Sequence, residues 1–143
     1  MDLPKVVQAF AVQVYTQALD IVQQLDTLDG RAVDAHQHRV DRIIPDVAAW
    51  LCHLTSEDLA LITTGHEPET PLHGGGVTEY PADAVQLVLE ARIRAAAEFC
   101  QHRHLNLAEF IQATGQYLSE QTDHKKAWLA ERAANLLVAG MGA

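Results

Sequence analysis

The sequence is short of basic residues. Its 143 residues include 10 Lys and Arg against 19 Asp and Glu, which gives a formal net charge of −9 with histidine neutral. Proteins that bind nucleic acids cluster Lys and Arg to neutralise phosphates, so this balance argues against a nucleic-acid partner. An acidic surface favours solubility and, where it meets another protein, a basic partner.

Cysteines, long apolar runs and strand patterns are scarce as well. Cys52 and Cys100 lie far apart in the sequence, which favours two free thiols over a disulfide framework. No apolar run approaches the roughly 20 residues of a membrane-spanning helix, and Met1-Asp2-Leu3 lacks the basic start of a secretory signal. No window alternates apolar and polar residues as a half-buried strand does. We therefore expect a cytoplasmic, helical protein that does not enter a membrane.

What the sequence does contain is a series of helical patterns, in which apolar residues recur every three or four positions. They predict helices over residues 3–26, 31–54, 55–64, 81–104 and 106–121, with a sixth starting at Thr122. The length suits one domain with its own core. We predict an all-α, single-domain bundle of five or six helices that spans residues 1–143.

Several local signals refine this prediction. Pro45 lies inside the second helix, whose apolar stripe keeps its phase, so we expect a bent helix there. Thr55 and Asp58 nearly match a capping box, Gly65 is placed to end the short third helix, and Asn106 is placed to cap a later one. The helix over 81–104 is rich in Ala and apolar on several sides, which predicts a central position.

The predicted core takes residues from each helix. It consists of Val7, Phe10, Val14, Ile21, Val40, Val47, Leu51, Val88, Phe99, Phe110, Leu118 and Leu136.

The stretch with no helical pattern, residues 65–80, separates the short third helix from the long fourth one. Connections in helical bundles usually have about 2–8 residues, and longer ones tend to be functional or disordered. This loop combines Gly and Pro breaks with histidines and glutamates, so we predict that it is the main binding surface. The candidate binding residues are His66, Glu67, Leu72, His73 and Tyr80.

The histidines raise a second hypothesis, that of a metal site for zinc or another divalent ion. In the loop, His66 and His73 would be the ligands, with Glu67 or Glu69 supplying charge. A solvated loop is the more frequent outcome for such a composition.

Cys100 and His104 form a second candidate pair, because residues four apart share one face of a helix. A buried thiol near a helix-ending histidine is the more frequent outcome for that spacing. The HExxH and CxxC patterns of established metal sites are absent from the sequence.

A third hypothesis concerns His36, which lies on the apolar stripe of the second helix. A core-facing histidine is more often satisfied by one hydrogen bond than used in catalysis. The segment from Arg31 to His36 resembles the Arg-x4–6-His motif of the HEPN ribonuclease superfamily, which is also all-helical. That resemblance implies RNA cleavage, with which the acidic composition fits poorly.

The leading prediction for function is a non-enzymatic cytoplasmic protein that acts through protein–protein interaction, as an accessory, regulatory or maturation factor. Its partner would be another protein or a second copy, with the first helix as a candidate dimer face. The alternative is a metal-binding bundle, or a metal-dependent enzyme that uses histidines of the loop and helix ends.

Overall fold

The structure is a computed structural model that describes residues 3–30, 32–72 and 82–122. These residues form five helices and no strand, so the predicted all-α bundle is confirmed. The helices are α1 (Leu3–Asp29), α2 (Val33–His53), α3 (Ser56–Thr63), α4 (Ala82–Arg103) and α5 (Leu107–Thr122). The predicted sixth helix and the second half of the 65–80 loop lie outside the described residues.

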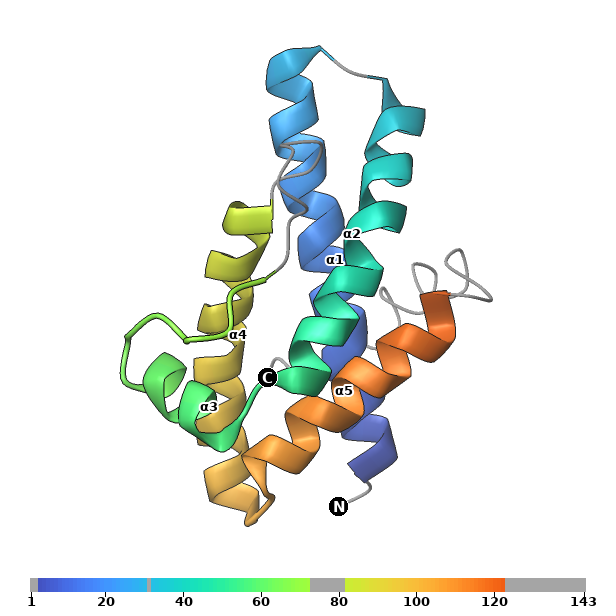
Figure 1. The fold of residues 1–143 in the computed structure, drawn as a ribbon. Coiled ribbons are helices and arrows are strands. Elements are labelled where there is room, and N and C mark those ends of the chain that lie inside the picture. The colour runs from blue at the N-terminus through green and yellow to red at the C-terminus, as the bar shows by residue number, and fades with distance from the viewer. Residues whose placement is uncertain (1–2, 31, 73–81, 123–143) are drawn as a thin grey trace.

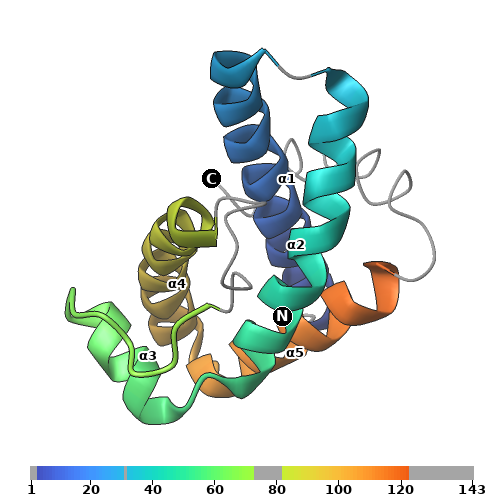
Figure 2. The same ribbon diagram turned by 45° about the horizontal axis from the view of Figure 1, so that its top comes forward.

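The helices α1 and α2 form a long antiparallel hairpin, and α5 crosses its lower half obliquely (Figures 1 and 2). The interface between α2 and α5 is the most extensive in the bundle, and α1 packs against α2, α4 and α5. The short α3 packs on α4, to one side of the hairpin (Figure 1). Within the described ranges, no helix has both the length and the apolar character needed to cross a bilayer.

The central helix of the bundle is α1, and the prediction of a central fourth helix is wrong. All residues from Ala9 to Tyr15 are buried, so this part of α1 is enclosed on every side by its neighbours. In α4, by contrast, Leu87, Ala91 and Ala95 are exposed. Alanine buries little apolar area, whereas the Val, Phe and Tyr side chains of α1 bury much more, and this difference favours α1 at the centre.

Most of the predicted core is confirmed. The buried members are Val7, Phe10, Val14, Val40, Val47, Leu51, Phe110 and Leu118. Ile21, Val88 and Phe99 were predicted to be buried but are only partly so. The centroids of the Phe99 and Phe110 rings lie 6.4 Å apart. The guanidinium carbon of Arg103 lies 4.1 Å from the centroid of the Phe99 ring. Leu136 lies outside the described residues.

The helix ends agree with the predicted signals. Thr55 and Asp58 form the complete capping box of α3, and Asn106 Oδ1 accepts a hydrogen bond from the Glu109 amide at the start of α5. Gly65 ends α3 with a φ of +86°. Pro45 lies within the continuous helix α2, so the prediction that the helix runs through it is confirmed.

The end of α4 was not predicted in this form. Helix α4 stops at Arg103, and His104 adopts a left-handed φ of 57°. The Leu105 amide donates to the Cys100 carbonyl at 2.9 Å and the His104 amide to the Gln101 carbonyl at 3.4 Å. This is the Schellman pattern of helix termination, with histidine at the position where glycine is usual.

We expect the substitution His104→Gly to raise the free energy of unfolding by about 0.5–1 kcal/mol. A residue with a Cβ in this conformation costs roughly 1–2 kcal/mol, and the greater freedom of glycine in the unfolded chain offsets part of the gain. Urea denaturation measures the difference. His102→Gly, inside the same helix turn, is the matched control and should lower stability by a similar amount. Equal losses for both variants would contradict the assigned backbone conformation.

Candidate functional site

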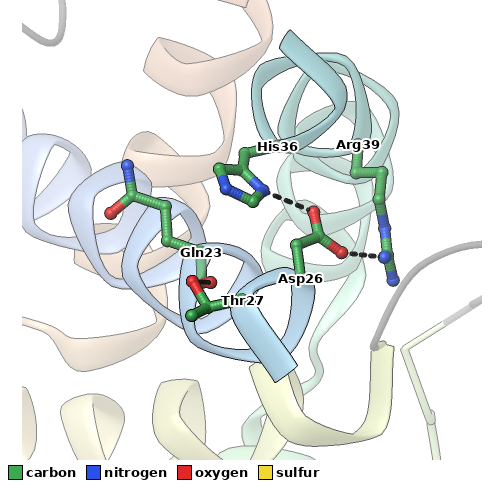
Figure 3. A network of polar contacts seen from close by, with 5 residues as sticks. All are labelled: Gln23, Asp26, Thr27, His36 and Arg39. Atoms are coloured by element: carbon green, nitrogen blue, oxygen red, sulfur yellow. Dashed lines mark hydrogen bonds and ion pairs between the residues drawn. The ribbon is translucent and has the colours of Figure 1, made fainter. Parts of the chain in front are cut away.

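An enclosed polar cluster lies near the connected end of the α1–α2 hairpin, beside the turn that joins the two helices (Figure 3). Asp26 of α1 is completely buried, and His36 of α2 is 7% exposed. The two residues are joined by a hydrogen bond of 2.8 Å between His36 Nδ1 and Asp26 Oδ2, and Arg39 donates to the other carboxylate oxygen. A single carboxylate thus connects the two helices through both of its oxygens.

The carboxylate of Asp26 determines the role of the His36 ring nitrogen that faces it. An ionised carboxylate only accepts hydrogen bonds, so His36 Nδ1 is the donor in this pair. The prediction of a core-facing histidine satisfied by one hydrogen bond is confirmed. Arg31, the other residue of the HEPN-like motif, lies outside the described residues, so that resemblance stays untested. What the described contacts support is a structural role, in which Asp26 holds the hairpin closed.

The first half of the predicted binding loop is tied down by side chains of three helices. We name residues 66–72 the strap. Asp58 of α3 accepts from the Glu69 amide at 3.0 Å and from the Thr70 hydroxyl at 2.8 Å. Trp50 Nε1 of α2 donates to the Thr70 carbonyl at 2.6 Å. The Leu72 amide donates to Gln86 Oε1 of α4 at 2.7 Å.

The predicted binding residues of the loop therefore have different surroundings. His66 and Glu67 are exposed, and His66 Nδ1 lies 3.1 Å from the Thr64 hydroxyl. Leu72 is 6% exposed and belongs to the core, so it packs inside the bundle and is not presented to a partner. His73 and Tyr80 lie outside the described residues. A binding role for His66 and Glu67 stays a prediction.

Asp58 is the buried acid that organises this region. Burial raises its pKa, but the hydrogen bonds from Thr70, Thr55 and the Glu69 amide outweigh that effect and leave the pKa lowered. A carboxylate whose pKa is lowered by folding stabilises the folded state above its ordinary pKa. That contribution is lost as the pH falls through the lowered value.

We expect Asp58→Asn to lower the free energy of unfolding by about 1–3 kcal/mol at pH 7, since hydrogen bonds to a charged group are lost. The deficit relative to wild type should persist down to about pH 5 and shrink below about pH 4, because Asp58 of the unfolded chain takes up a proton there, whereas the folded carboxylate does so only at lower pH. Urea denaturation at several pH values measures it. Exposed Glu57→Gln is the control at pH 7, with an effect within about 0.5 kcal/mol. A deficit that is unchanged at low pH would contradict the role of the charge.

The predicted metal residues show no metal-binding geometry in the described part of the chain. Because α4 ends at Arg103, Cys100 and His104 do not share the helical face on which their pairing was based. Cys100 is buried, and burial raises the pKa of its thiol, whereas His104 is exposed. Among the described residues, no three His, Cys, Asp or Glu side chains gather closely enough to hold an ion. The pair His66 and His73 stays a prediction, which metal analysis of the purified native protein tests.

An open groove of about 310 Å³ lies between α3 and the first turn of α5. Its walls mix apolar side chains such as Leu59 and Leu107 with the polar Ser56, Thr63 and Asn106. None of the described residues that line it has an acidic or basic side chain.

On the outward face of α4, an exposed leucine and two exposed alanines lie among exposed charged residues of the same helix. Leu87 is 68% exposed, and Ala91 and Ala95 follow it at spacings of four residues, both exposed. Residues four apart lie above one another on a helix, so these three side chains form one stripe. We name Leu87, Ala91 and Ala95 the α4 stripe.

Comparisons with protein-family models, with curated proteins and with solved structures find no match to this chain.

Sequence reasoning missed two features of this region. It identified Asp58 only as a helix cap, although the same carboxylate also holds the strap. It predicted a central position for the whole helix and did not single out Leu87, which the structure has at the surface together with Ala91 and Ala95. One feature of the sequence could have indicated an exposed apolar face on this helix, namely the apolar residues on several sides of residues 82–103. A helix that is apolar on several sides needs more than one packing partner.

Proposed function

We propose that this protein acts by binding another protein through the α4 stripe, as an accessory, regulatory or maturation factor. The observation that supports the proposal is the exposure of Leu87 next to Ala91 and Ala95 on the outer side of a helix. Full burial of a leucine side chain contributes roughly 1.5–3 kcal/mol. Small alanines below it allow a second helix to approach closely, since interhelical distances depend on the side chains at the contact.

The net charge of the chain favours one class of protein partner over another. With a net charge of −9, two copies repel each other in general, whereas a basic protein is attracted. A basic protein partner is therefore the first choice and a second copy the next. We place the activity in the cytoplasm, which the two free thiols of Cys52 and Cys100 support, because extracellular proteins tend to pair their cysteines.

The test compares Leu87→Asp with Leu28→Asp. Both leucines are highly exposed, at 68% and 83%, but Leu28 lies at the end of α1, outside the α4 stripe. We expect wild type and Leu28→Asp to retain the same protein from lysate of the source cells, and Leu87→Asp to bind it at least about ten-fold more weakly, because a charge would enter an apolar contact.

Sedimentation velocity over a range of concentrations reports self-association of the same three proteins. Far-UV circular dichroism shows that each variant keeps its helices. If Leu87→Asp retains the same proteins and the same association state as wild type, the α4 stripe is not the binding surface.

A further inference from the structure

The helix α3 and the strap share one set of polar contacts, which is centred on Asp58. Asp58 caps α3 through Thr55 and also accepts two of the four hydrogen bonds that hold the strap. Loss of the first turn of α3 therefore removes the acceptor that holds Glu69 and Thr70. Release of the strap in turn leaves the buried carboxylate short of donors, which is costly. The two segments depend on each other through this one side chain.

Helices α1, α2 and α5 are joined by contacts that involve neither α3 nor the strap. The Phe10 and Phe110 rings lie 5.2 Å apart and join α1 to α5. At Gly115, α5 approaches the backbone of α2 closely. Helix α3 packs on α4 and contributes Leu59 and Ile62 to the core, and the strap adds Leu72. An element of this size with few large buried side chains is typical of the low-stability end of a protein.

We propose that α3 and the strap form one cooperative unit that opens from the bundle while α1, α2 and α5 stay folded, with Asp58 as its latch. Opening breaks the bond from Trp50 Nε1 to the Thr70 carbonyl and uncovers an indole that is 4% exposed in the closed form. It also frees Gln86, the neighbour of Leu87 in α4, from the Leu72 amide. This proposal does not depend on the α4 stripe having a partner.

Amide hydrogen exchange measured by NMR tests the proposal on the full chain. The reporters of the unit are the amides of Leu59, Ile62, Glu69 and Leu72, and those of the core lie in the middle of α1 and α5. In wild type, we expect the four unit amides to share one opening constant, at least ten-fold larger than that of the core. The opening constant of the unit should also rise less steeply with urea, because opening exposes less surface than global unfolding.

Two variants separate local from global opening. Asp58→Asn should raise the opening constant of all four unit amides by the same factor, about ten-fold. Phe10→Leu changes the ring pair between α1 and α5, so it should speed exchange in the core and leave the unit unchanged. If Asp58→Asn does not fold, Thr70→Val removes one latch bond and should raise the same four constants by a smaller common factor.

Three results would overturn the proposal. In the first, the unit amides of wild type exchange with the same opening constant as the core. In the second, Phe10→Leu speeds the unit and the core equally. In the third, the latch variant speeds the strap amides but leaves those of α3 unchanged.

Discussion

The substitution Asp26→Ala is expected to lower the free energy of unfolding by about 3–5 kcal/mol. Asp26 is completely buried and accepts hydrogen bonds from both His36 and Arg39. Its removal leaves the guanidinium of Arg39, whose side chain is 12% exposed, without its counter-charge. Losing one partner of a buried ion pair is among the most destabilising single changes in proteins. Urea denaturation followed by circular dichroism measures the loss.

The control for this prediction is Asp29→Ala, which removes an exposed carboxylate from the same end of α1 and should change stability by less than about 0.5 kcal/mol. Combining Asp26→Ala with Arg39→Met should recover part of the loss, because the unpaired charge is then gone as well. A loss below about 1 kcal/mol for Asp26→Ala would show that the cluster does not hold the hairpin together.

The substitution Gly115→Ala is the second change for which we expect a large effect. A Cβ at this position would lie 2.7 Å from the Ala48 carbonyl oxygen, 2.7 Å from Cys52 Sγ and 2.9 Å from the Cys52 amide nitrogen. Two of these atoms belong to the α2 backbone and cannot move aside alone. Such overpacking costs about 1–3 kcal/mol, against a gain of up to about 1 kcal/mol in helix propensity, and Gly115→Val should cost more.

Gln116→Ala is the matched control, since it changes the next residue of α5 on the exposed side of the helix. We expect it to leave the urea midpoint within error of wild type or slightly above it. If Gly115→Ala raised the midpoint as an ordinary Gly→Ala change in a helix does, α2 and α5 would not be in close contact at this glycine.

The helices and their ends could be predicted because the signals are local. The capping box of Thr55 and Asp58, the stop at Gly65 and the continuous helix through Pro45 each depend on residues within a few positions of one another. The end of α4 is an exception. Its left-handed residue is His104, and nothing in the sequence marks a histidine for a position where glycine is usual.

The polar contacts between elements could not be predicted, because they join residues that are distant in the sequence. Asp26 is ten positions from His36, and Asp58 is 12 from Thr70. From the sequence alone, Asp26 and Asp58 would each be interpreted as a solvated residue or a helix cap. The place of α4 was also undetermined, since a helix that is apolar on several sides does not show which side meets the bundle. In the structure, α1 occupies the centre of the bundle because its side chains are larger and bury more apolar area.

The binding role of the α4 stripe is tested most directly by site-specific photo-crosslinking in the source cells. Benzoylphenylalanine is placed at Ala91 in the stripe or, as the reference, at Gln116 on the exposed side of α5. We predict a covalent adduct with a protein, either a basic partner or a second copy, from position 91 and none from position 116. Adducts of equal yield from both positions, or none from position 91 while the variant stays folded, would contradict the proposal.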